Sequence, residues 1–345
     1  MNDSNSSLAA QVIEFCAQVG ADSLLVQGPG GNVSWKEDGV LLIKASGKWL
    51  ADAKSSEIFV PVGLPPLQNA LAKSDFTIVP TAMRDSQLRP SIETLLHVLM
   101  PHKIVVHLHP VEMLSHLVRS NQKEAIPRYI GQEVNWIYVD YAKPGAELAE
   151  AVSHQLVNAT ATEVIFLGNH GVLIGGEDIK QISLTLNRLT SAFKIDTAPY
   201  SALHAAQSSK VPPAMTNYQI CADLQLNQLA LDERLAKRLR TSWALYPDHV
   251  VFLGAEPVIL DASAQPGDLE QISLTKPPFI FAIGQGVYES SEVTLAQRSQ
   301  LRCYYDVVIR QSTDDPLTTL SQKQVFELVS WESEKHRVSQ DILRQ

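Results

Sequence analysis

Residues 103–109 read Lys-Ile-Val-Val-His-Leu-His, and Pro110 follows directly. The apolar, β-branched run predicts a buried strand, and a proline is expected to end it because proline cannot donate to a sheet. Side chains alternate across a strand, so His107 and His109 are expected on one face. Two imidazoles at the end of a strand suit zinc or a similar divalent metal. An equally open alternative is that one of them is a core histidine bonded to the backbone.

A third histidine, His170, lies in Leu-Gly-Asn-His-Gly-Val-Leu at residues 167–173. The apolar runs 163–167 and 172–174 predict two strands with a turn between them. Glycines on both sides permit a tight backbone and a close approach to a bound group. His170 is therefore the candidate third ligand, although a turn histidine on its own is more often structural or exposed.

Glu93 is the candidate base, in the segment Arg-Pro-Ser-Ile-Glu-Thr-Leu-Leu-His at residues 89–97. A helix is predicted over 91–100, after Pro90 and with Ser91 as its cap. The simplest role for Glu93 is a first-turn carboxylate that favours the helix dipole. Beside a divalent metal, it could instead remove a proton from the carbon next to a carbonyl group.

Two loops, Gly-Gly-Asn-Val-Ser at 30–34 and Ile-Lys-Ala-Ser-Gly-Lys at 43–48, offer backbone N–H groups together with polar side chains. Such loops suit phosphate or carboxylate oxygens, although both could be ordinary turns. The first loop is not a dinucleotide fingerprint, because Val33 stands where a third glycine is needed and a strand follows it.

The remaining pattern mixes helices and strands without an internal repeat. Helices are predicted over 6–20 and 179–194, and a β-meander over 33–35, 40–44 and 58–60. A connection rich in Ala, Ser and Pro occupies 197–215. Beyond it, helical patterns cover 219–241, 291–311 and 320–335, and strand-like runs cover 249–261 and 278–288. We therefore predict an α/β or α+β chain with one domain over 1–196, a linker over 197–216 and a C-terminal α/β region over 217–345.

Composition narrows the class of protein. The chain has 345 residues, is 45% hydrophobic and carries a formal net charge of −9 without a basic stripe, which argues against nucleic acid as a partner. No apolar run reaches the roughly 18 to 20 residues of a membrane span, and the N-terminus does not read as a signal peptide. Three widely spaced cysteines argue against a disulfide framework. We expect a cytoplasmic protein that does not act at a membrane.

Five short motifs in this order resemble the class II aldolase/adducin family. They are Gly31-Asn-Val-Ser34, Ala45-Ser-Gly47, Pro90-Ser-Ile-Glu93, Val106-His-Leu-His109 and Gly168-Asn-His-Gly171. The resemblance covers residues 8–195 and implies a central, largely antiparallel sheet flanked by helices. Residues 91–97 are most similar to the aldolase part of rhamnulose-phosphate aldolase/dehydrogenase proteins. The tail resembles them more loosely, at Asp248-His-Val-Val, Gly284–Tyr288 and Trp331-Glu332. The sequence ends at Gln345, so we expect no dehydrogenase domain.

The resemblance also implies roles for particular residues. His107, His109 and His170 would bind zinc, and Glu93 would be the acid/base residue. The residues implied to bind substrate phosphate are Gly31, Asn32, Ser46, Gly47 and Ser91. Relatives often carry a second serine where this chain has Ile92, so one hydroxyl donor is lost, and Lys44 or Lys48 is the candidate replacement. The family often uses a tyrosine as proton donor, for which Tyr138 and Tyr141 are candidates, and a homo-oligomer is implied.

The activity implied is that of a metal-dependent aldehyde-lyase, an aldolase of carbohydrate metabolism. It would cleave a ketose phosphate or a related hydroxy-keto compound through a metal-stabilised enediolate. A sugar-phosphate 4-epimerase shares the fold, but that branch usually has aspartate in place of Glu93. A non-catalytic adducin-like binding module would lack the metal histidines, which this chain has.

Overall fold

The structure is a computed structural model that describes residues 7–83, 86–131, 134–197, 217–261, 272, 274–342 and 344. Its first half alternates helices with strands. The elements are α1 (Leu8–Ala21), β1 (Asn32–Glu37), β2 (Val40–Lys44), η1 (Leu50–Asp52), β3 (Phe59–Gly63), α2 (Leu64–Leu71), α3 (Thr94–Leu99), β4 (Ile104–Leu108), α4 (Val111–Leu117), α5 (Gln122–Ile130), β5 (Trp136–Val139), α6 (Ala146–Leu156), β6 (Val164–Leu167), β7 (Gly171–Gly176) and α7 (Ile179–Ala192).

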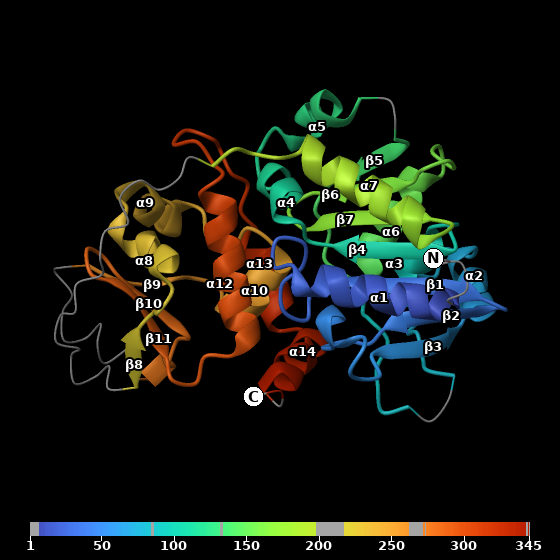
Figure 1. Ribbon diagram of the computed structural model, residues 1–345, viewed down its shortest axis with the longest axis horizontal. Helices are drawn as coiled ribbons and strands as arrows, with labels where there is room; N and C mark the ends of the chain where they lie inside the picture. The colour runs from blue at the N-terminus through green and yellow to red at the C-terminus, as the bar shows by residue number, and fades with distance from the viewer. Residues whose placement is uncertain are drawn as a thin grey trace, which may run out of the picture.

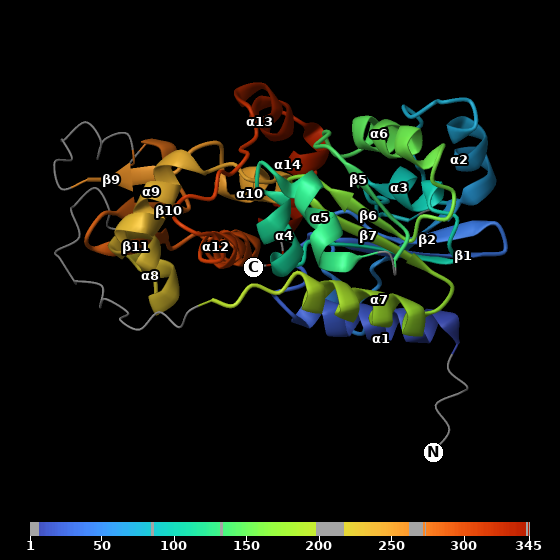
Figure 2. The ribbon, with the colours of Figure 1, turned by 90° about the horizontal axis from the view of Figure 1, so that it is seen from above.

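These strands form one seven-stranded sheet in the order β3-β2-β1-β4-β7-β6-β5. Every pairing is antiparallel except that of β5 with β6, which is parallel. Helices α1 and α7 cover one face, and α2, α3 and α6 cover the other (Figures 1 and 2). The predicted largely antiparallel sheet between helices is confirmed.

Strand β4 lies at the centre of this sheet and is buried along its whole length. Ile104, Val106 and Leu108 pack into the core on the side of α1 and α7, whereas Val105 packs into the core on the opposite side. Side chains alternate across a strand, so His107 shares the face of Val105, toward α3 and α6.

The second half builds a smaller sheet and several more helices. The elements are β8 (Tyr218–Ile220), α8 (Leu224–Leu231), α9 (Glu233–Thr241), α10 (Pro247–Leu253), β9 (Val258–Leu260), β10 (Phe279–Ala282), β11 (Gly286–Ser290), α12 (Leu295–Val308), α13 (Gln322–Val329) and α14 (Glu332–Ile342). The four-stranded sheet has the order β8-β11-β10-β9. Helices α10, α12, α13 and α14 lie between the two sheets (Figures 1 and 2). Val111, Leu114 and Val118, in and just after α4, join the hydrophobic core of this half.

Several predicted boundaries were wrong. Residues 249–253, predicted as part of a strand, belong to helix α10, which starts at Pro247; proline suits a first helical position because its missing N–H has no helical partner there. The helix predicted over 219–241 is preceded by β8 and is broken where Asp232 caps α9. The helix predicted over 320–335 is divided into α13 and α14. Most of the predicted linker lies outside the described residues, and the division into domains stays a prediction.

None of the helices in the described part of the chain combines the length and apolar character of a membrane span.

Candidate functional site

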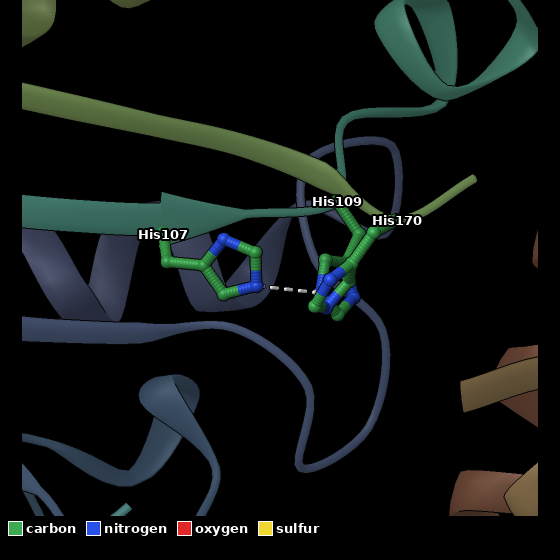
Figure 3. A group of neighbouring side chains, drawn as sticks. All are labelled: His107, His109 and His170. Carbon is green, nitrogen blue, oxygen red and sulfur yellow. Dashed lines mark hydrogen bonds between the residues drawn. The ribbon is translucent and has the colours of Figure 1, made fainter. Parts of the chain in front are cut away.

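The three predicted histidines lie together at one end of the large sheet. His107 is near the end of β4, His109 follows that strand, and His170 is on the turn between β6 and β7. Antiparallel pairing of β4 with β7 brings this turn beside the end of β4. One nitrogen of each imidazole lies within 4.8 Å of the other two, and all three residues are buried (Figure 3).

The turn around His170 has no room for a side chain at Gly171. A Cβ atom on Gly171 would collide with the Leu108 carbonyl oxygen and would lie 2.8 Å from Cδ2 of His109. Asn169 adopts the left-handed conformation, with φ of 52°, and its side-chain amide donates to the carbonyls of Leu245 and Thr318. The glycine permits the close approach, and Asn169 ties the turn to the second half of the chain.

Two of the imidazoles turn one ring nitrogen toward each other. Nδ1 of His107 donates to the Val172 carbonyl at 3.1 Å, which leaves Nε2 unprotonated and 3.0 Å from Nε2 of His109. His107 is therefore bonded to the backbone and still presents a free ligand atom. Burial lowers the pKa of His109 to about 3 and that of His170 to about 4, which favours the neutral, metal-binding form. The cluster fits a divalent metal ion.

Glu93 faces this cluster. Its Oε2 lies 3.4 Å from Nε2 of His107, and its Oε1 lies 3.3 Å from Nε2 of His170. The predicted helix over 91–100 begins only at Thr94, and the Glu93 carboxylate accepts no capping hydrogen bond. The predicted helix start was therefore wrong, and Glu93 is the N-cap residue instead of part of the first turn. The Ser91 hydroxyl accepts the Glu93 backbone N–H, and the Glu93 carboxylate faces the histidines.

A buried chain of hydrogen bonds holds Glu93 in place. Ser34 Oγ contacts His97 Nδ1 at 2.7 Å, and Nε2 of His97 donates to Oδ1 of Asn32. The Asn32 amide then donates to Glu93 at 2.8 Å and to Ser91 at 3.2 Å. Burial raises the pKa of Glu93, but the neighbouring imidazoles and the Asn32 donor lower it by more than burial raises it. The pKa of Glu93 therefore lies well below its ordinary value. Asn32 was predicted to bind phosphate, but both N–H bonds of its side-chain amide already donate to protein groups.

His97 was not singled out from the sequence. Its position four residues after Glu93 was the available signal, because residues at that spacing share a helical face.

The residues predicted to bind phosphate surround one pocket together with Glu93, His109 and His170. The complete lining is Pro29, Gly31, Asn32, Lys44, Ser46, Gly47, Ser91, Ile92, Glu93, His109, Pro144, His170, Pro247, Asp248 and Arg337. Gly31 and Gly47 are left-handed, with φ of 61° and 76°, so a side chain would be strained at either position. The Ser46 backbone N–H donates to the Arg89 carbonyl, which leaves the Ser46 hydroxyl as its donor toward the pocket.

Lys44, one of the two lysines considered for the missing hydroxyl, lines this pocket, whereas Lys48 does not. The Lys44 ammonium is buried and donates to the carbonyls of Pro29 at 2.9 Å and of Lys48 at 2.5 Å. Burial, with a smaller contribution from nearby Arg337, lowers the pKa of Lys44 to about 7. Both protonation states of Lys44 are thus accessible near neutral pH.

The pocket also contains residues from the second half of the chain that the sequence did not reveal as functional. Asp248 Oδ2 lies 3.5 Å from Nδ1 of His109, and Arg337 donates to Asp248 Oδ1 at 2.8 Å. Asp248 entered the sequence analysis only as part of a resemblance in the tail. Within the described residues, neither tyrosine candidate lines the pocket: the Tyr138 hydroxyl accepts from Gln122 at 2.9 Å, and the Tyr141 hydroxyl is buried without a hydrogen bond.

Comparison with known protein families gives a match, which covers more than half of the chain. The family described as Class II Aldolase and Adducin N-terminal domain matches residues 10–197. The chain therefore belongs to the class II aldolase and adducin family.

Individual relatives cover only part of the chain. A Bacillus subtilis (strain 168) protein named uncharacterized oxidoreductase YuxG is 29% identical over 175 residues, which are 46% of this chain and 25% of that protein. The chain thus matches about a quarter of that relative's length. Among solved structures, the N-terminal class II aldolase domain of a conserved Thermoplasma acidophilum protein is 25% identical, with a TM-score of 0.47, over 56% of this chain and 95% of that one. An L-fuculose-1-phosphate aldolase from Thermus thermophilus is 21% identical, with a TM-score of 0.36, over 53% and 92%.

Proposed function

We propose that this chain is a metal-dependent aldolase that cleaves a ketose phosphate or a related hydroxy-keto compound. The observation that carries the proposal is the placement of Glu93 within 3.4 Å of two of the three clustered histidines. A base beside a candidate metal site is what carbon–carbon cleavage next to a carbonyl requires. Zinc as the ion and a homo-oligomer stay predictions from the family resemblance, and a cytoplasmic location stays a prediction from composition.

The three imidazoles of His107, His109 and His170 would hold the ion. A bound divalent metal would act as a Lewis acid that stabilises the enediolate left when the carbon–carbon bond breaks. In cleavage, the β-hydroxyl loses its proton, the bond breaks, an aldehyde leaves and the remaining carbon takes up a proton. We assign the proton transfer to Glu93: its carboxylate, ionised at rest, would take up the proton that the hydroxyl loses and pass it to carbon, and would remove a proton from carbon in the reverse direction.

Glu93 suits this role because it is ionised and held firmly. The Asn32 donor fixes one carboxylate oxygen, and the other, Oε1, is buried without a hydrogen bond. A buried polar atom usually has a partner, so an unpaired carboxylate oxygen is available for a bound group. Asn32, expected to bind phosphate, acts in this proposal mainly by orienting Glu93.

The anionic end of the substrate is assigned to the donor groups of the pocket that do not hold the metal. Lys44, the hydroxyls of Ser46 and Ser91, and the turns at Gly31 and Gly47 are the available groups. A charged ammonium in a buried pocket strengthens an anion's hydrogen bonds. Lys44 would thus replace the hydroxyl that Ile92 lacks.

The body of the substrate has room beside these groups. The metal-side pocket holds about 20 Å³, enough for one water molecule. Ser46, Ser91 and Ile92 also line an adjoining cavity of about 720 Å³, which lies in the usual range for small-molecule sites. We place the anionic group near the two serines, between the metal pocket and this cavity.

The test is a screen of ketose phosphates and their unphosphorylated analogues with protein that has been stripped of metal and reloaded with zinc. Aldehyde release that needs the reloaded metal and disappears in the Glu93→Gln protein would support the proposal. Reloaded protein that releases no aldehyde from any of them, or releases it equally without metal, would overturn it.

A further inference from the structure

One carboxylate from the second half of the chain, that of Asp248, lies beside the candidate metal ligand His109. Asp248, in the first turn of α10, is 4% exposed, and its Oδ2 points at Nδ1 of His109 across 3.5 Å. This oxygen is buried and has no hydrogen-bond partner. Nε2 of His109 faces the centre of the histidine cluster, so Nδ1 is the nitrogen that remains for Asp248.

Arg337 and Glu334 of α14 fix the direction of that carboxylate. Arg337 donates to Asp248 Oδ1 at 2.8 Å and to Glu334 at 2.9 Å. Because Oδ1 is held by the guanidinium, Oδ2 is the oxygen left to face the imidazole. Arginine suits this position because its planar group binds two acceptors in fixed directions.

Two glycines make room for the arrangement. A Cβ atom on Gly30 would lie 2.7 Å from Asp248 Oδ2 and 3.1 Å from Nδ1 of His109. A Cβ atom on Gly47 would lie 2.9 Å from Cβ of Gln340, so only a residue without a side chain lets α14 pack on this turn. The missing side chain at Gly30 lets the Asp248 carboxylate approach His109. The missing side chain at Gly47 lets α14, which carries Arg337, pack on this turn.

We propose that Asp248, held by Arg337, is a positioning residue for the metal ligand His109, so that the C-terminal half completes the metal site. A metal-binding histidine usually donates its second ring N–H to a carboxylate or carbonyl, which fixes the ring and makes the ligand nitrogen more basic. Within the cluster, the Val172 carbonyl accepts from His107 in this way. Asp248 Oδ2, unpaired and 3.5 Å from Nδ1 of His109, is the oxygen positioned to do so for His109. The inference rests on the proposed metal site and not on the identity of the substrate.

The experiment compares Asp248→Asn with a matched change elsewhere, Glu112→Gln. Glu112 is also a buried carboxylate that accepts from an arginine across the two halves, Arg310, which follows α12, at 2.9 Å, but it contacts none of the three histidines. Both variants replace a buried, paired carboxylate by an amide, so both report any general loss of packing. The full-length proteins are stripped of metal, and zinc and cobalt(II) affinities are measured by competition with a chromophoric chelator.

We expect Asp248→Asn to weaken metal binding about 10- to 100-fold, the range found for lost partners of metal-bound histidines, and to change the visible spectrum of bound cobalt(II). Glu112→Gln is expected to keep both the affinity and the spectrum. Arg337→Lys keeps the charge but cannot bind two acceptors in fixed directions, so it should lose less metal affinity than Asp248→Asn. It replaces Asp248→Asn as the test variant if that protein does not fold. If the Asp248 and Arg337 variants bind metal as tightly as the wild type, the positioning role alone is overturned. Wild-type protein that binds no metal would overturn the proposed metal site as well.

Discussion

Replacing Glu93 with glutamine is the sharpest test of the proposed chemistry. Glutamine keeps the size of the side chain, and its carbonyl oxygen can still accept the hydrogen bond that Asn32 gives at 2.8 Å. What disappears is the negative charge and the ability to carry a proton at the 3.3 Å and 3.4 Å contacts with the two histidines.

The expected loss follows from the role of the residue and its surroundings. General acid–base catalysis contributes roughly 100- to 10,000-fold, or about 3 to 5 kcal/mol of barrier. The pocket beside Glu93 holds about 20 Å³, so at most one water could act in place of the carboxylate. We therefore expect turnover to fall at least about 100-fold. The three imidazoles remain, so metal content should stay close to that of the wild type.

The assay is aldehyde release from a substrate verified with the wild-type protein, at equal metal content for both proteins. Glu112→Gln provides the control for a buried glutamate outside the site and is expected to turn over normally. Metal-loaded Glu93→Gln protein that retains turnover within about tenfold of the wild type would refute the assignment of Glu93 as the base.

Three further predictions concern the metal, the anion and pH. His109→Ala should lose most of its metal after mild chelation, because one of three ligands is removed; equal retention by wild type and variant would disprove the three-histidine site. Lys44→Met and Ser46→Ala should raise the Michaelis constant for a phosphorylated substrate about tenfold, for a lost charged hydrogen bond, but leave that for the unphosphorylated analogue unchanged. If wild-type enzyme does not distinguish the two compounds, phosphate is not recognised. His249 is buried with no hydrogen bond to either ring nitrogen, and burial lowers its pKa from 6.5 to about 3. Between those values the unfolded chain binds the extra proton, so stability falls as pH falls, by about 1.4 kcal/mol per pH unit for this group. His249→Phe should remove that contribution, and parallel curves of unfolding free energy against pH for the two proteins would contradict it.

Local sequence patterns were enough to predict the strand at 103–109 and to single out the three histidines. The run at 103–109 has the apolar character of a buried strand, and a spacing of two places His107 and His109 on one face whatever surrounds them. Glycines beside His170 indicated a tight turn, and the structure shows that Gly171 has no room for a side chain. These features depend on chain geometry over a few residues, which is why they could be predicted before any tertiary contact was known.

Other local patterns were ambiguous for a physical reason. Residues 249–253 form a short apolar run that is almost wholly buried, and such a run has no polar face to reveal its period. It was therefore predicted as a strand although it is helical. Glu93 was expected in a first helical turn, but the helix starts at Thr94, and the Glu93 carboxylate lies beside His107 and His170.

The sequence by itself determined a buried strand that presents two histidines, a glycine turn that presents a third, and the family to which these motifs belong. Only the tertiary structure decided that Asp248 and Arg337 stand beside His109, that His97 and Asn32 hold Glu93, and that Lys44 rather than Lys48 enters the pocket. The physical reason is that each of these placements depends on packing between elements far apart in the chain. Such contacts leave no periodic signal in the residues that make them.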